Sequence, residues 1–144
     1  MEYTLAIIKP DAVARNLTGR ILAHLEEEGF RIRGIRMLRL SEAEAREFYA
    51  VHRERPFYES LVRFMTSGPV VPVLLEREGA VARLREVIGA TDPAEARPGT
   101  VRALYAESKE RNAIHASDAP ETAQREAAFF FATADVLRAA PDAA

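Results

Sequence analysis

The chain has 144 residues, with 20 Lys or Arg and 22 Asp or Glu side chains, a formal net charge of −2, and 48% hydrophobic residues. These values are typical of one globular domain with its own core, so we expect a single domain over 1–144 that ends in a short, weakly ordered, alanine-rich tail over 132–144. Cysteine is absent, which excludes disulfides, cysteine-ligated metals and thiolate nucleophiles.

The first third of the chain predicts a strand, a helix and a second strand. The apolar run 3–8, which Pro10 stops, is typical of a buried strand. Apolar residues at helical spacing then predict a helix from a candidate N-cap at Thr18 to a stop at Gly29. In the strand that follows, the apolar positions change parity at Gly34, which predicts a β-bulge there.

The middle of the chain predicts three helices and one strand. A capping-box pattern at 41–44 opens a helix to about residue 49, and a second helical stripe covers 57–68. The strand expected over 70–75 contains Pro72, which cannot donate to a ladder and therefore demands a bulge or an edge position. Another helical stripe covers 81–88 and is stopped by a glycine.

The last third begins with an irregular segment and then predicts a strand and a helix. No clean period is found over 90–112, and so long an irregular segment in a compact domain is usually functional. The apolar pair 113–114 predicts a short strand that leads into His115. Ser117 or Asp118 can cap the helix that follows to about residue 130.

The three histidines are the first candidates for chemistry, and they are too far apart for a local zinc motif. We interpret His24 as a surface residue of the first helix. For His52, at a helix end, a structural role and an active-site role have equal weight. His115 lies where a strand meets a helix, a place where ligands collect, although spacing alone equally allows a buried histidine with satisfied nitrogens.

Side chains suited to phosphate gather around the irregular segment and favour a binding site there. Arg85, Thr91, Arg102 and Asn112 supply guanidinium, hydroxyl and amide donors, although each taken singly reads as a surface residue. The glycine-rich phosphate loops are absent, so a nucleotide would be held by side chains. Lys9 closes the first strand in a chain that uses arginine at eighteen of its twenty basic positions, which indicates a compact ammonium rather than a snorkelling surface lysine.

The charge pattern disfavours nucleic acid and membranes as partners. The net charge is near zero, and the arginine-bearing strand after residue 30 lacks the aromatic side chains that would stack bases. No apolar run reaches the roughly 18–20 residues of a membrane span, and no signal peptide is evident, so we expect a cytoplasmic protein. Lys109, the second lysine, receives no role.

These residues belong to longer motifs that resemble nucleoside diphosphate kinases from Tyr3 to about Phe131. The resemblance implies a ferredoxin-like α/β (α+β) sandwich, a four-stranded antiparallel sheet with helices on one face. It also implies a ping-pong enzyme that moves the γ-phosphoryl group of a nucleoside triphosphate, typically ATP, to a nucleoside diphosphate through a phosphohistidine. The motifs run from Leu5 to Val13, Phe48 to His52, Arg55 to Phe57, Thr66 to Val71, Gly89 to Pro93, Pro98 to Arg102 and Asn112 to Asp118.

The resemblance also assigns roles within the site. It makes His115 the nucleophile and Glu126 the carboxylate that binds the far imidazole nitrogen, while Phe57 stacks the base. Mg²⁺ is expected to bridge the phosphates without protein ligands. The residues matched near the transferred phosphoryl group and the ribose are Lys9, Tyr49 and Asn112. Those matched on the other phosphates are Arg85, Thr91 and Arg102. Ser117 matches the hydroxyl beside the active histidine, and His52 would lie close to the phosphates.

Three departures from the family pattern stand out. Ala116 replaces the usual glycine after the histidine, and a methyl group would strain a backbone of positive φ and slow turnover. That departure motivates the alternative, a nucleotide-binding regulatory module of the same fold with weak or lost turnover. Leu104 replaces a common aspartate and Pro72 a frequent alanine, with effects expected on loops or assembly. The resemblance implies a homo-oligomer, a tetramer or hexamer built from dimers.

Overall fold

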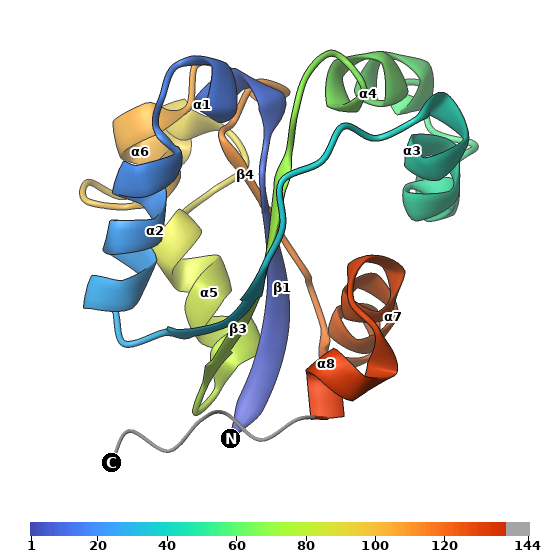
Figure 1. The fold of residues 1–144 in the computed structure, drawn as a ribbon. Helices are drawn as coiled ribbons and strands as arrows, with labels where there is room; N and C mark the ends of the chain where they lie inside the picture. The colour runs from blue at the N-terminus through green and yellow to red at the C-terminus, as the bar shows by residue number, and fades with distance from the viewer. Residues whose placement is uncertain (138–144) are drawn as a thin grey trace.

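The computed structural model describes residues 1–137 and contains one four-stranded antiparallel sheet in the order β2-β3-β1-β4 (Figure 1). The central pair is β1 (Glu2–Ile8) and β3 (Val71–Arg77). The short strand β4 (Ile114–Ala116) lies outside β1, and β2 (Arg31–Ile35) lies outside β3. The four expected strands and their antiparallel arrangement are therefore confirmed.

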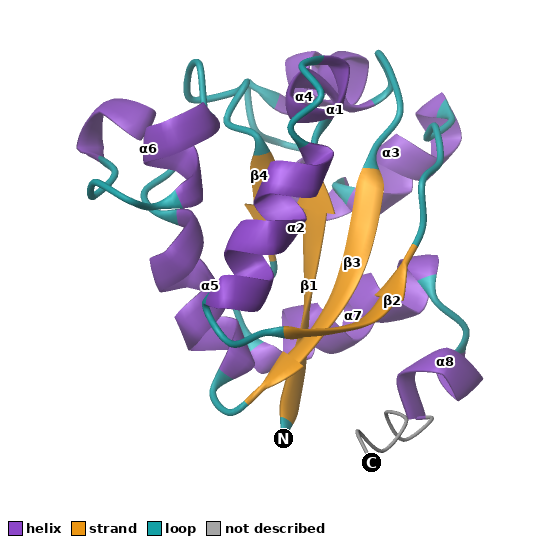
Figure 2. Cartoon of the chain, turned by 60° about the vertical axis from the view of Figure 1, so that its left-hand side comes forward, coloured by secondary structure: helices purple, strands orange, loops and turns teal. Residues whose placement is uncertain are grey.

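Helices cover both faces of the sheet, whereas the resemblance implied one face (Figures 1 and 2). Successive side chains of β1 enter opposite cores, Ala6 and Ile8 on one side and Leu5 and Ile7 on the other. A strand buried on both faces is apolar throughout, which explains the uninterrupted run in the sequence. One face carries α1 (Pro10–Ala14), α2 (Thr18–Glu27), α5 (Ala80–Ile88) and α6 (Val101–Tyr105), and the other α3 (Glu42–Phe48), α4 (Tyr58–Met65) and α7 (Pro120–Phe130).

The β-bulge expected at Gly34 is confirmed, because the register of β2 against β3 shifts between Ile32 and Gly34. A Cβ atom on Gly34 would lie 2.9 Å from the ring of Phe131, so the close approach of that ring requires glycine. The bulge thus lets the edge strand β2 pack closely against Phe131 at the end of α7.

The placement expected for Pro72 is wrong, because it lies in the interior strand β3, opposite Ile7 of β1. Its carbonyl accepts a hydrogen bond from the backbone N–H of Arg36, just beyond the end of β2. A hydrogen-bonded residue pair in an antiparallel ladder exchanges two hydrogen bonds. Pro72 has no N–H, so only the bond that its carbonyl accepts is made. The missing donor is tolerated because β2 has already ended.

Two of the three expected helix caps are also wrong. The capping box of α3 is present, with Ser41 and Glu44 each bonding the other's backbone N–H. The N-cap of α2, however, is Leu17 rather than Thr18, and that of α7 is Ala119 rather than Ser117 or Asp118. Ser117 and Asp118 lie before Ala119, so neither occupies the N-cap position.

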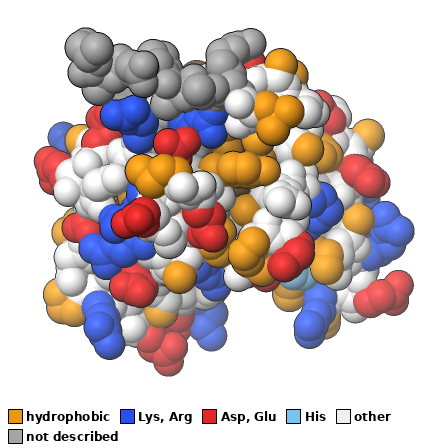
Figure 3. All heavy atoms as spheres, turned by 90° about the horizontal axis from the view of Figure 1, so that it is seen from below, with side chains coloured by type: hydrophobic (Ala, Val, Ile, Leu, Met, Phe, Trp, Pro, Cys, Tyr) orange, Lys and Arg blue, Asp and Glu red, His pale blue; other side chains and the backbone are white. Residues whose placement is uncertain are grey.

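The end of the described chain forms a further short helix, α8 (Thr133–Leu137), whose Val136 packs against the core. Residues 138–144 of the tail expected over 132–144 lie outside the described residues. No helix among residues 1–137 is long and apolar enough to cross a membrane. On the face seen in Figure 3, acidic and basic side chains are interspersed rather than gathered in a patch of one sign.

Candidate functional site

A cavity of about 650 Å³ opens where β1 ends and β4 begins, between the helices of the two faces. It brings together residues that are more than a hundred positions apart in sequence. The predicted site residues in its lining are Lys9, Tyr49, His52, Phe57, Arg85, Thr91, Arg102, Asn112, His115 and Glu126. Ser117 is the one predicted residue outside the lining, and it lies directly behind Glu126.

A histidine, a carboxylate and a serine form a hydrogen-bonded group in the cavity wall. His115 lies within β4 rather than after it, and its Nε2 is 2.7 Å from Oε1 of Glu126 on α7. Ser117 donates to the same oxygen at 2.7 Å. Burial opposes ionisation of Glu126, but the bonds from His115 and Ser117 outweigh it and hold the pKa of this carboxyl below its ordinary value.

These contacts determine the tautomer of His115. An ionised carboxylate only accepts hydrogen bonds, so the proton lies on Nε2 of His115 and points to Glu126. The lone pair is therefore on Nδ1. Phe48 and Tyr49 meet the imidazole edge-on, with ring centroids 5.6 and 6.0 Å away, and hold its plane. The geometry orients the imidazole through Nε2 and leaves Nδ1 as the free, nucleophilic nitrogen.

A buried lysine follows β1 and lies in the same cavity as His115. Lys9 is 7% exposed, and its Nζ donates to Oδ1 of Asn112 at 2.8 Å. Burial and the positive charge of Arg102 lower the pKa of Lys9 to about 8. The ammonium is thus held in a site that disfavours its charge until an anion arrives.

Two arginines line the cavity next to Lys9. Arg102 is buried and donates to the carbonyls of Gly89 and Ile114, while its Nε has no partner. Burial and the charge of Arg85 lower the pKa of Arg102 to about 10. Arg85 itself donates to the carbonyl of Ala116 at 3.3 Å. The cluster of cations is a binding region for a polyanion.

The α3–α4 hairpin supplies the aromatic side of the cavity. The hydroxyl of Tyr49 is buried without a partner, and burial together with the charge of Glu126 raises the pKa of that phenol. The rings of His52 and Phe57 lie 5.3 Å apart, and Phe57 is 46% exposed at the mouth. Burial and the charge of Arg55 lower the pKa of His52, so its neutral form is favoured.

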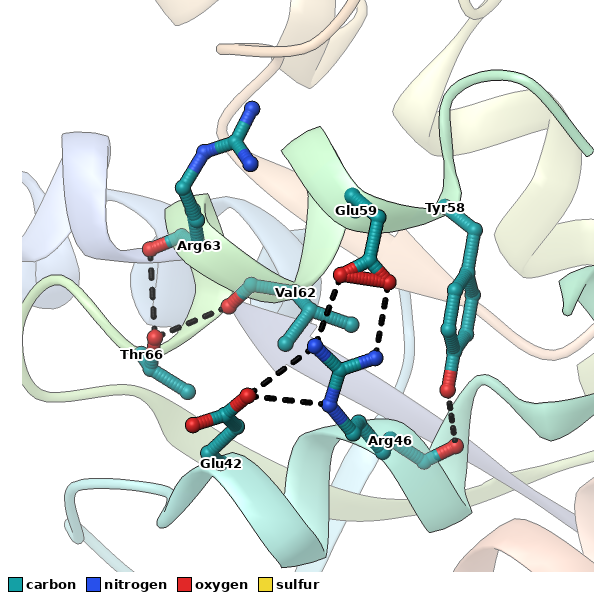
Figure 4. A network of polar contacts seen from close by, with 7 residues as sticks. All are labelled: Glu42, Arg46, Tyr58, Glu59, Val62, Arg63 and Thr66. Carbon is teal, nitrogen blue, oxygen red and sulfur yellow. Dashed lines mark hydrogen bonds and ion pairs between the residues drawn. The ribbon is translucent and has the colours of Figure 1, made fainter.

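Arg46 fastens this hairpin together, as Figure 4 shows. Its guanidinium binds Glu42 on its own helix and both carboxylate oxygens of Glu59 on α4, at 2.8 and 2.7 Å. Tyr58 donates to the carbonyl of Arg46 at 2.9 Å. A bidentate pair of this kind fixes geometry, so the two helices present their aromatic residues as one unit.

The strain that Ala116 could introduce is not found. Among residues 1–137 the only non-glycine residues with positive φ are Asn16 and Ala113. Ala116 is a β4 residue paired with Ala6 and is 4% exposed. Its methyl group therefore occupies an ordinary strand position, and the left-handed residue of this segment lies three positions earlier.

The sequence analysis also missed parts of the cavity. Lys109, which received no role, lines the same wall as Phe57. The next residue, Glu110, accepts a hydrogen bond from Ser60 of α4 at 2.7 Å and so ties the segment before β4 to the hairpin. Asp11, part of the first motif, is buried under the cavity and bonds the backbone of Ala113. No local sequence pattern reveals these contacts, because each joins distant segments.

The ferredoxin-like fold and its cationic cavity with an oriented histidine define a nucleotide phosphotransferase. The profile of the family described as nucleoside diphosphate kinase matches residues 2–136. The chain belongs to the nucleoside diphosphate kinase family. It is therefore an enzyme that moves the γ-phosphoryl group of a nucleoside triphosphate to a nucleoside diphosphate, and enzymes of this family work with a divalent cation.

Individual relatives support the assignment. A nucleoside diphosphate kinase of Nitratiruptor sp. is 57% identical over 137 residues, which cover 95% of this chain and all of the relative. That of Gluconacetobacter diazotrophicus is 59% identical over 94% of this chain and 97% of its own. The structure of the Aquifex aeolicus enzyme matches with a TM-score of 0.91 at 50% identity, covering 93% of this chain and 97% of that one. The Halobacterium salinarum enzyme in complex with CDP gives a TM-score of 0.92 at 39% identity, covering 99% of this chain and 95% of that one.

Proposed function

We propose that Nδ1 of His115 is the nucleophile of the transfer. Its lone pair attacks the γ-phosphorus of the triphosphate, an N–P bond forms, and the bond from that phosphorus to the β–γ bridging oxygen breaks. The nucleoside diphosphate leaves with the electron pair on its terminal oxygen. A second diphosphate then attacks the phosphohistidine with its own terminal oxygen, which restores the imidazole and balances the cycle.

The surrounding side chains serve alignment and charge. Phosphoryl transfer depends mainly on positioning and on stabilising the charge of the equatorial oxygens. We assign Lys9, Asn112 and Tyr49 to the transferred group and ribose, because they meet beside His115 in one cavity. Arg85, Arg102 and Thr91 bind the remaining phosphates, His52 lies near them, and Phe57 stacks the base at the mouth.

Glu126 and Ser117 act through the histidine rather than on the substrate. The observation that carries the proposal is the 2.7 Å contact between Nε2 of His115 and Glu126, since it leaves Nδ1 as the nucleophile. As the imidazole becomes phosphorylated, the carboxylate stabilises the positive charge that develops on the ring. Ser117 keeps the acceptor oxygen in place.

Mg²⁺ is the divalent cation we propose, carried in by the nucleotide. The side chains aimed at the phosphates are cations, so the metal would be held by phosphate oxygens and by water, as Mg²⁺ prefers. When bound, it neutralises charge between the phosphate groups. Lys9 and the arginines then bind the oxygens that the metal leaves free.

The test is labelling with γ-³²P-ATP. Wild-type protein is expected to acquire one acid-labile, alkali-stable phosphate, which a diphosphate acceptor removes as triphosphate. His115→Ala should acquire none while still binding nucleotide, and His24→Ala, which alters the histidine of α2, should behave as wild type. A folded, nucleotide-bound wild type that stays unlabelled would refute the proposal.

We further infer a cytoplasmic homo-oligomer, a tetramer or hexamer built from dimers, that needs no nucleic acid or membrane. Ile35 and Met37, 48% and 62% exposed at the outer edge of the sheet, supply apolar surface that assembly would cover. Sedimentation equilibrium measures the stoichiometry, and a monomer at micromolar concentration would contradict the inference. The alternative of a regulatory module with lost turnover has no support from Ala116, because that residue is unstrained.

A further inference from the structure

The backbone immediately before His115 makes a turn that alanine adopts only under strain. Ala113 has φ of +74°, and the N–H of Ile114 donates to the carbonyl of Asn112 at 2.9 Å. A hydrogen bond between residues two apart, around a central residue of positive φ, defines the rare and strained form of the γ-turn. Such strain persists only where the surroundings over-determine the conformation.

The surroundings that hold this turn come from the segment after β1. The N–H of Ala113 donates to Oδ2 of Asp11 at 3.1 Å, and its carbonyl accepts from the backbone N–H of Lys9 at 2.9 Å. Asp11 is 1% exposed, and within residues 1–137 its Oδ1 has no hydrogen-bond partner. A carboxylate in the first turn of α1 is thus kept in the interior, where it joins this turn of the chain to the backbone of Ala113.

The residues on either side of the turn are those of the reaction. Asn112 precedes it and accepts from Nζ of Lys9 at 2.8 Å, and its amide nitrogen donates to the carbonyl of Thr91 at 3.4 Å. Ile114 follows it and begins β4, in which His115 pairs with Ile7. If φ of Ala113 relaxed to a negative value, the chain direction would change between Asn112 and His115.

We propose that Asp11 is a positioning residue, which holds the left-handed γ-turn at Ala113 and thereby sets the placement of Asn112 relative to His115. The inference rests on the proposed function of His115 as the nucleophile. Asp11 touches neither substrate nor reacting atom, and it acts through the backbone that connects the two residues.

The decisive comparison is between Asp11→Ala, which loses the hydrogen bond to Ala113, and the same variant combined with Ala113→Gly, which relieves the strain of the turn. Asp11→Ala removes the acceptor of the Ala113 N–H, and we expect the turn to relax because the remaining backbone bond from Lys9 does not by itself offset the strain of Ala113. Ala113→Gly alone should behave as wild type, because glycine populates positive φ without penalty. In the double variant the glycine keeps the turn accessible, so the reaction should recover. A role in folding alone predicts no such recovery.

Matched controls exist for both changes. Glu2→Ala removes another carboxylate that accepts a backbone N–H, that of Val81 at 2.8 Å, at the far end of β1. Asn16→Gly alters the other non-glycine residue with positive φ, at 58°. Both should leave the transfer rate unchanged.

The measurement is the single-turnover rate of phosphate transfer from saturating γ-³²P-ATP to His115, per folded molecule at pH 7, beside the midpoint of thermal unfolding. Asp11→Ala should lower the rate at least about tenfold, since small misplacements of reacting groups have effects of this size or more. Asp11→Ala/Ala113→Gly should return to within about threefold of wild type without recovering the unfolding midpoint.

The inference is overturned if Asp11→Ala keeps a rate within about threefold of wild type, or if the double variant is no faster than Asp11→Ala. Should Asp11→Ala not fold, Asp11→Asn decides. Its amide oxygen can still accept from Ala113, so a near-normal rate is expected, and a tenfold loss refutes the role of the hydrogen bond. A wild type that is never labelled refutes the proposed function instead, which separates the two failures.

Discussion

Lys9→Met is expected to stabilise the fold at neutral pH while abolishing transfer. The pKa of Lys9 is lowered by burial and by Arg102 from 10.5 to about 8. At about 1.4 kcal/mol per pKa unit, the buried charge costs about 3 kcal/mol at pH 7. Methionine has similar volume and no charge, and loss of the bond to Asn112 offsets about 1–2 kcal/mol. A net gain of about 2 kcal/mol in free energy of unfolding remains.

The pH dependence identifies the cause. Between pH 8 and 10.5 the unfolded chain keeps the Lys9 proton that the folded chain has lost, so the stability of the wild type rises with pH through this window. The advantage of Lys9→Met should therefore shrink by about 2 kcal/mol between pH 7 and pH 9.5.

Urea unfolding at the two pH values measures the effect, with Lys109→Met, at an exposed lysine, as the control that should leave the free energy of unfolding unchanged. The same samples should show Lys9→Met transferring phosphate at least about a hundredfold more slowly. A variant that is less stable than wild type by the same amount at both pH values would refute the reasoning, because the ammonium would then not be penalised by burial.

Three further predictions concern single side chains. Ala116→Gly should lower the free energy of unfolding by about 0.5–1 kcal/mol, as glycine does in a strand, and leave the transfer rate within about threefold; a tenfold faster variant in single-turnover labelling would contradict the relaxed backbone. Thr4→Val should raise the free energy of unfolding measured in urea by about 1 kcal/mol, because the buried Thr4 hydroxyl has no hydrogen-bond partner within residues 1–137. A lower free energy of unfolding would mean that the hydroxyl does have a partner. Glu126→Gln should slow labelling of His115 about a hundredfold or more, because the amide can turn either a donor or an acceptor to Nε2, with nucleotide affinity as the control that should not change.

The elements that the sequence predicts well are those whose signal is local. Apolar runs and glycine stops placed all four strands and the longer helices, and the parity change at Gly34 located the bulge. The caps expected at Thr18 and at Ser117 or Asp118 failed because α2 already begins at Thr18 and α7 begins only at Pro120. Ser117 donates to Glu126, nine residues away, and that contact depends on the packing of α7 against the sheet.

In the site, too, local sequence signals were informative and contacts between distant segments were not. The chemistry of the residues and then the resemblance supplied the candidates, and the structure gathers all but Ser117 around one cavity. The γ-turn at Ala113 could not be predicted, because alanine is a poor indicator of positive φ and the bonds that enforce it come from residues 9 and 11. Pro72 shows the converse, since a local rule demanded a bulge or an edge position, whereas the proline lies in an interior strand and is tolerated because β2 ends before it.

The lowered pKa values of Lys9 and Arg102 connect the fold to the reaction. Both cations are buried, and each is also disfavoured by a neighbouring positive charge. The folded protein therefore bears a cost in the absence of ligand that a bound phosphate relieves, because an anion within a few ångströms favours both charged forms. Preorganised charge of this kind requires no rearrangement when negative charge is redistributed during transfer. The same side chains that make the cavity unfavourable in isolation thus make it complementary to the phosphates, and this explains why the chain keeps a lysine at position 9.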